Sequence, residues 1–163
     1  TLLDSYTLLP QRGSIYSEEG RRRRFKTLVF DHQRGTAAYE LKTATLLTRE
    51  VALPPSCHDA LSVVYALRAI ALKAGDRITL PVADSGRIYH VQFAVTGRET
   101  IRSGIGPTNA WRIVPTIQQG QGRAEDSGIV LWVSDDARRA PVRIKVDLAV
   151  GSFNLVLKQA SYS

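Results

Sequence analysis

The sequence predicts a mostly β fold, in which a strongly curved antiparallel sheet, or a partly open β-barrel, holds one buried α-helix in its concave face. Apolar and polar residues alternate along many short segments, which is typical of strands with one buried face. One segment, residues 57–73, instead carries apolar residues around most of a helical circumference. Because such a helix must be covered, we expect the sheet to curve around it.

The strand pattern is clearest near the C-terminus. Aliphatic residues occupy alternate positions from Pro141 to Val150, and the alternation resumes after Gly151, which predicts a closing antiparallel hairpin. Residues 129–133 are apolar on both faces, as expected of a central strand. The other predicted strands are residues 25–30 and 36–41, joined by a turn, and residues 89–95, 98–103 and 108–117, with Thr96 and Gly97 as a turn.

The boundaries of the helix follow from its flanking residues. Pro54 and Pro55 end the preceding strand, and Ser56 followed by Asp59 has the spacing of an acidic capping box. Gly75 lies just beyond the apolar pattern, where a glycine commonly ends a helix. The predicted helix is therefore residues 57–73.

Length and composition favour one domain over residues 1–163. The chain is 44% hydrophobic and 23% charged, which is ordinary for a globular protein. With Cys57 as its single cysteine, it forms no intrachain disulfide. No apolar run approaches the roughly 20 residues of a transmembrane helix, and no signal peptide is seen. Since the chain contains no methionine, we expect further residues upstream of Thr1.

The net charge of +7 is concentrated at Arg21–Arg24, which suggests an anionic partner. If this run belongs to a strand, alternate side chains point to opposite faces. That alternation favours a solvated strand end over one continuous basic patch.

The sequence lacks the residue sets that carry most chemistry. His32, His58 and His90 are far apart, and Cys57–His58–Asp59 opens the predicted helix, where neighbouring residues do not face one another. No nucleophile elbow or phosphate-binding glycine loop is present. We therefore expect no catalytic residues, no metal and no cofactor, while enzymatic activity stays open.

Six residues are candidates for ligand binding. Arg68 and Tyr65 share one helix face, and Arg68 either forms a structural ion pair or faces a ligand. Asp135 and Asp136 either cap a turn or act together on a cation or as acid and base. Trp111 and Trp132 belong either to the core or to an apolar or sugar-stacking cleft.

Five motifs are spread along nearly the whole chain. They are Phe30-Asp31 with Gly35, the segment Asp59-Ala-Leu-Ser-Val-Val-Tyr65-Ala-Leu-Arg68, Val95-Thr-Gly97-Arg98-Glu99, Trp132-Val-Ser-Asp135-Asp136 and Arg139-Ala-Pro141-Val. In this order and spacing they resemble the bacterial DUF3108 family. The resemblance implies an exported, periplasmic protein, a curved antiparallel sheet with a helix in its concavity, and additional N-terminal strands, and it implies no settled activity.

The leading functional hypothesis is a non-catalytic binding or structural module of the bacterial cell envelope, with a lipid, glycan or envelope protein as its partner. The alternatives are a polysaccharide- or cell-wall-active enzyme that uses Arg68, Asp135 and the tryptophans, and nucleic-acid binding through the basic surface. We expect no specific nucleic-acid partner, because aromatic residues are not interleaved with the basic ones.

Overall fold

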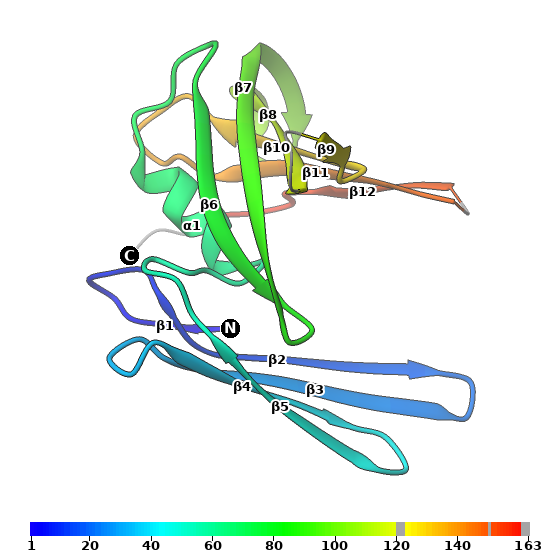
Figure 1. The fold of residues 1–163 in the computed structure, drawn as a ribbon. Coiled ribbons are helices and arrows are strands. Elements are labelled where there is room, and N and C mark those ends of the chain that lie inside the picture. The colour runs from blue at the N-terminus through cyan, green and yellow to red at the C-terminus, as the bar shows by residue number, and fades with distance from the viewer. Residues whose placement is uncertain (120–122, 150, 161–163) are drawn as a thin grey trace. The chain divides into compact units, whose positions relative to one another are not determined.

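The computed structural model describes residues 1–119, 123–149 and 151–160, and in these residues it confirms a mostly β fold with antiparallel sheets and one helix, α1 (Figure 1). One sheet has the order β1-β2-β3-β4-β5, and the other has the order β12-β11-β10-β8-β7-β6 with β9 paired to β8. Neither order closes into a barrel within these ranges. The elements are β1 (Leu2–Leu3), β2 (Pro10–Glu19), β3 (Arg22–Asp31), β4 (Thr36–Lys42), β5 (Leu46–Ala52), α1 (Ser62–Ala69), β6 (Arg77–Asp84), β7 (Arg87–Ser103), β8 (Gly106–Gln119), β9 (Arg123–Asp126), β10 (Ile129–Ser134), β11 (Pro141–Leu148) and β12 (Gly151–Val156).

The chain divides into two compact units. Unit 1 comprises Thr1–Ala66 and Leu80–His90, and unit 2 comprises Leu67–Thr79 and Val91–Ser163. The elements α1, β6 and β7 contribute residues to both units. The single domain expected over residues 1–163 stays a prediction.

Unit 1 is built on the five-stranded sheet. In the β3–β4 pair, Leu28 lies opposite Tyr39 and Phe30 opposite Ala37, so these four alternate residues share one face. They are buried in one core cluster with Cys57 and Ala83. The predicted hairpin of residues 25–30 and 36–41 is confirmed, and its turn is closed by the Arg34 amide, which donates to the Asp31 carboxylate at 2.9 Å.

Unit 2 has a separate core cluster. Its buried residues come from β7, β8, β10, β11 and the loop before β11, and they are Ile101, Ala110, Trp132, Ala140 and Val142. The closing hairpin is confirmed, because β11 pairs antiparallel with β12 and Val146 lies opposite Phe153. β12 is exposed along its whole length, as expected of a strand that ends a sheet.

The predicted turn at Thr96 and Gly97 is wrong. β7 continues through both residues from Arg87 to Ser103. Gly97 has φ of +155°, which residues with a side chain rarely adopt, so this glycine changes the strand locally without ending it.

The helix is shorter than predicted, Ser62–Ala69 instead of residues 57–73. Ser56 does not cap it, because Ser56 has φ of +56° and the chain then runs extended beside β6. There the His58 amide donates to Pro81 O at 2.9 Å, and the Ala83 amide donates to His58 O at 2.7 Å. These hydrogen bonds pair the amide and the carbonyl of His58 with β6, as in a sheet. The segment before residue 59 therefore cannot form helical hydrogen bonds.

Asp59 is the actual cap of α1. Its Oδ1 accepts the Ser62 amide at 2.7 Å, while Ser62 Oγ accepts the Asp59 amide at 2.8 Å. This reciprocal pair is a capping box three residues later than predicted. Val63 and Leu67 are buried, but Tyr65 is 46% exposed, so the helix is less enclosed than its composition suggests. Within the described ranges no helix is both long and apolar enough to cross a membrane.

The burial of Cys57 yields a test of the unit 1 core. Its side chain is fully buried, and burial raises the pKa of the thiol to about 11. We expect the native protein to react with a thiol reagent such as Ellman's reagent at least about a hundredfold more slowly than the unfolded chain, since the reactive thiolate is rare and enclosed. Because Cys57 is the single cysteine, the absorbance change measures this site alone. Equal rates in native and urea-unfolded protein would contradict the core described here.

Candidate functional site

The candidate site in unit 2 is built around the loop that joins β10 to β11. Its two ends are held together, because the Ser134 amide donates to Ala140 O at 2.8 Å and the Ala140 amide donates to Ser134 Oγ at 2.8 Å. Ser134 is buried, so the loop begins from a rigid point at the end of β10.

Asp136 organises the inside of this loop. Its Oδ1 accepts Ser134 Oγ at 2.8 Å and the Arg138 amide at 3.0 Å, and its Oδ2 accepts Arg138 Nε at 2.8 Å. The hydrogen bond from the Arg138 side chain is the main reason why the pKa of Asp136 lies below its usual value. Of the two interpretations of this carboxylate, turn capping therefore describes its contacts.

Arg68 and Arg139 join the loop to the end of α1. Arg68 donates through Nε to Arg139 O at 2.6 Å and through Nη2 to Arg138 O at 3.1 Å. In return, Arg139 Nη1 donates to Arg68 O at 3.3 Å and also to Ile70 O. Each guanidinium thus binds carbonyl oxygens beside the other, and Arg139 places a positive charge at the C-terminal end of the helix, where cations are favoured.

Asp135 is held by two groups from neighbouring strands. Its Oδ2 pairs with Arg98 Nη1 at 2.7 Å, and its Oδ1 accepts Trp111 Nε1 at 2.8 Å. The Arg98 guanidinium also lies over the Trp111 ring, 5.2 Å from its centroid. β7, β8 and the loop after β10 therefore meet in one polar cluster at the Trp111 side chain.

A hollow of about 220 Å³ lies beside this cluster, and we refer to it as the Trp111 hollow. Its apolar wall comes from the segment after α1 and from β10, and its polar wall from the β10–β11 loop. It is lined by Ile70, Ala71, Leu72, Trp111, Val133, Ser134, Asp135, Asp136, Ala137 and Arg139. Three of the six predicted candidates, Trp111, Asp135 and Asp136, thus meet at one concave site.

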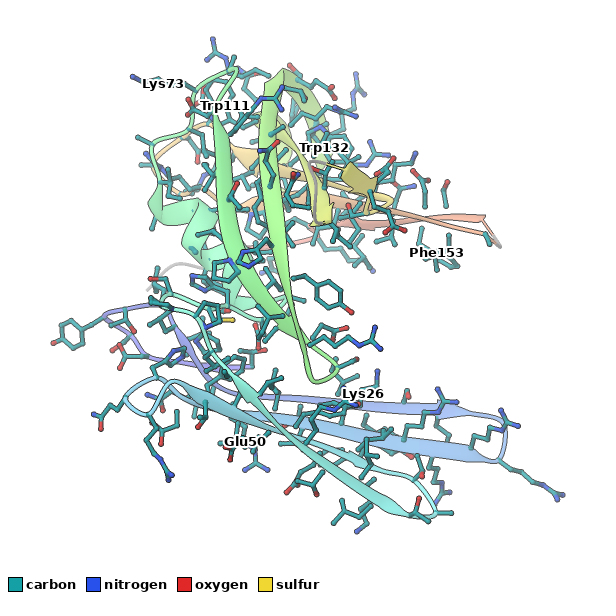
Figure 2. All side chains as sticks on the ribbon, in the orientation of Figure 1. Lys26, Glu50, Lys73, Trp111, Trp132 and Phe153 are labelled. Carbon is teal, nitrogen blue, oxygen red and sulfur yellow. The ribbon has the colours of Figure 1, made fainter. Side chains whose placement is uncertain are left out.

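The other three candidates lie elsewhere. Arg68 does not line the Trp111 hollow but supports its rim through Arg138 and Arg139. Trp132 is 5% exposed and donates Nε1 to Glu99 Oε2 at 3.1 Å, so it belongs to the core; Figure 2 labels both tryptophans. Tyr65 lies in the part of α1 that belongs to unit 1.

Sequence reasoning missed Arg98, Ile70 and Leu72 as parts of this site. The Asp135–Asp136 pair predicts a cation nearby, and the nearest cations in the sequence are Arg138 and Arg139 in the same loop. Arg98 is 37 residues away from Asp135, and only strand pairing brings the two together. Nothing in the local pattern at residues 70–72 indicates a hollow.

A serine, a histidine and an aspartate also meet in unit 1. His58 Nδ1 lies 3.2 Å from Ser62 Oγ, beside Asp59. Ser62 is fully buried and its hydroxyl is engaged in the capping box, so no substrate reaches it. This cluster is structural. In the part of the chain that the structure describes, no three His, Cys, Asp or Glu side chains are placed to hold a metal ion.

Comparison with known proteins identifies a family. The model of a family described as a protein of unknown function, DUF3108, matches residues 1–158. No curated protein and no solved structure matches the chain.

Replacement of Arg139 tests the link between the loop and the helix end. We expect Arg139→Ala to lower the free energy of unfolding by about 2 kcal/mol, because charged hydrogen bonds to helix-end carbonyls are lost. Arg138→Ala, which removes a half-exposed ion pair with Asp136, is the matched control and should cost about 0.5 kcal/mol. Urea unfolding followed by circular dichroism measures both. An equal cost for the two variants would contradict the proposed role of Arg139.

His58 should make stability depend on pH. Burial, with a smaller contribution from His32, lowers the pKa of His58 below its usual value against an opposing effect of Asp59. The unfolded chain, in which this pKa is about 6.5, therefore binds more protons just below neutral pH. We expect the free energy of unfolding to be highest above about pH 7 and to fall, by at most about 1.4 kcal/mol per pH unit, as pH drops toward the folded pKa.

Two variants assign this pH dependence. His58→Gln should flatten the profile between about pH 7 and 5, while His90→Gln, at an exposed position, should leave it unchanged. Chemical unfolding across this range is the measurement. A profile that His58→Gln leaves unaltered would show that other groups cause the effect.

Proposed function

The chain belongs to the DUF3108 family, whose function is unknown, and we propose that it is a non-catalytic binding module of the bacterial cell envelope that takes an apolar or amphipathic ligand at the Trp111 hollow. The observation that carries the proposal is the lining of the hollow. The apolar residues Ile70, Leu72 and Trp111 line it together with the charged residues Asp135 and Arg139. Such a mixture of apolar surface and few polar groups is typical of small-molecule sites.

The carboxylates of Asp135 and Asp136 are already bound by other protein groups, and this favours ligand binding over catalysis. Both oxygens of Asp135 have a partner, and Asp136 is bound by Ser134 and Arg138. A polysaccharide hydrolase needs one carboxyl group whose pKa is raised, so that it holds a proton to donate. The pKa of Asp136 is instead lowered, so this group is ionised at neutral pH.

The hydrolase alternative keeps one observation in its favour, because Asp135 and Asp136 line the same hollow as Trp111. An indole wall next to carboxylates is also how proteins hold sugar rings. That alternative requires a release of Arg98 or Arg138 when substrate binds, since those arginines now neutralise the carboxylates. Without such a release the site binds but does not transfer protons.

The envelope location is the part of the proposal that rests on family resemblance. Members of the family look exported, and the same location would give the module access to lipids, glycans and envelope proteins. The volume of about 220 Å³ suits the apolar end or the headgroup of an amphiphile better than a whole lipid, since sites for drug-sized ligands begin near 300 Å³.

Octyl glucoside, used below its critical micelle concentration, tests the proposal, because it joins an apolar chain to one sugar. We expect the indole N–H resonance of Trp111 to shift in a proton–nitrogen correlation spectrum, while that of Trp132, bonded to Glu99 in the core, stays in place. Trp111→Ala should weaken binding about tenfold by titration calorimetry, from the loss of aromatic contact. Tyr6→Ala, which truncates an aromatic side chain that is 95% exposed, is the matched control.

Three results would contradict the proposal. They are an unchanged Trp111 resonance, equal shifts of the two tryptophans, and equal weakening by Tyr6→Ala and Trp111→Ala. A shift of the same size with glucose alone would assign the hollow to glycans and favour the polysaccharide alternative.

A further inference from the structure

The end of the five-stranded sheet in unit 1 is only partly paired. β2 and β3 stay in register out to Glu19 and Arg22, whereas β3 and β4 pair no further than Phe25 and Lys42. Figure 1 shows the β2–β3 turn and the β4–β5 turn at this same end of the sheet. The first three residues of β3 therefore have a paired strand on the β2 side and not on the β4 side.

All four arginines of the basic run gather at this end. Arg21, Arg22, Arg23 and Arg24 line a hollow of about 360 Å³ together with Thr43 and Ala44 from the β4–β5 turn, and we refer to it as the arginine hollow. Strand alternation predicts two arginines on each face. They line one hollow nevertheless: Arg21 lies in the β2–β3 turn, outside β3, and β4 leaves the edge of β3 unpaired at Arg22–Arg24.

The charge of the arginine hollow is unbalanced. None of the described residues that line it is acidic. All four arginines are exposed, and the ion pair of Arg23 with Glu18, at 3.2 Å, involves side chains that are 75% and 45% exposed. Exposed pairs of this kind are weak, so Arg23 can exchange Glu18 for another anion.

A row of exposed apolar side chains lies next to these arginines. Tyr16, Phe25 and Leu46 lie in one cross-strand row over β2, β3 and β5, with Lys42 of β4 between the last two, so they share one face of the sheet. The exposed fractions of Tyr16, Phe25 and Leu46 are 58%, 40% and 64%. On the other face Ile15 and Leu47 are 58% and 52% exposed. This end of the sheet is thus amphipathic, with its apolar row adjacent to a cationic rim.

We propose that the arginine hollow and the adjacent apolar row form a docking surface for an anionic phospholipid membrane. The planar guanidinium groups match phosphate oxygens in geometry and charge, and four such groups favour a surface that offers many phosphates at once. The apolar row contacts the boundary between headgroups and acyl chains, as interfacial apolar residues do. This surface belongs to unit 1 and the Trp111 hollow to unit 2, so the inference goes beyond the function proposed for that hollow.

Vesicle co-sedimentation with the full chain tests this proposal. We expect binding to vesicles of phosphatidylcholine mixed with phosphatidylglycerol, and at least about tenfold weaker binding to phosphatidylcholine alone. The double variant Arg21→Gln/Arg24→Gln should reduce binding by roughly 25-fold, since each basic residue near an anionic surface contributes about a fivefold factor. The matched control is Arg34→Gln/Arg102→Gln, which removes the same charge at two exposed positions elsewhere and should reduce binding no more than about twofold.

The apolar row has its own test. Tyr16→Ser/Leu46→Ser should weaken binding to the anionic vesicles about tenfold. It should also make the remaining binding more sensitive to salt, because the electrostatic part then makes up a larger share of it. Slow reaction of Cys57 with Ellman's reagent, as in the unaltered protein, establishes that this variant is folded.

Four outcomes would overturn the proposal. The first two are equal binding to both kinds of vesicle and equal losses in the two double-arginine variants. The third is release from vesicles by millimolar inorganic phosphate at constant ionic strength, which would assign the arginine hollow to a free phosphate ion. The fourth is tighter binding to duplex DNA that the apolar variant leaves unchanged, which would assign it to nucleic acid.

Discussion

The reciprocal hydrogen bonds that the guanidinium groups of Arg68 and Arg139 form with backbone carbonyl oxygens are the interaction on which unit 2 depends most. Arg68 binds the carbonyl oxygens of residues 138 and 139, and Arg139 binds those of residues 68 and 70. A helix end exposes carbonyl groups that lack partners within the helix, and a loop exposes more of them. Two arginines satisfy both sets at once. The backbone of Arg139 has φ of +43°, a costly conformation for a residue with a side chain, and the bonds on both sides of it stabilise that conformation.

This link also decides what the neighbouring carboxylates can do. The loop is held at its ends by Ser134 and Ala140, inside by Asp136, and on its outer side by Arg68. Asp135 is therefore presented to Arg98 and Trp111 in one orientation. A preorganised wall of this kind suits selective binding, because little conformational freedom remains to be lost when a ligand arrives. It suits proton transfer less well, since the charges that hold the wall also keep Asp136 ionised.

The sheet of unit 1 combines a buried core with exposed apolar side chains. Leu28, Phe30 and Tyr39 belong to a closed core, whereas Tyr16, Phe25 and Leu46 at the end with the arginines are exposed. Exposed apolar side chains in a contiguous group commonly mark an interaction surface. The arginines beside them keep this surface soluble and at the same time select its partner by charge. The chain thus offers a small hollow of mixed apolar and polar lining in unit 2 and a cationic sheet edge in unit 1, which suit different ligands.

The sequence by itself determined the elements whose signals are local: the antiparallel β character, the hairpins at residues 25–41 and 141–156, and the presence of one helix. These depend on side-chain period and turn chemistry, which neighbouring residues carry. The tertiary structure alone decided that Ser56 leaves the capping to Asp59, because backbone bonds to β6 take the preceding residues. It also decided that Arg98 meets Asp135 and that Trp132 enters the core while Trp111 lines a hollow. Trp132 lies in the apolar run 129–133, whereas Trp111 lies between Ala110 and Arg112, but which side of each strand is covered depends on pairing between strands that are distant in the sequence.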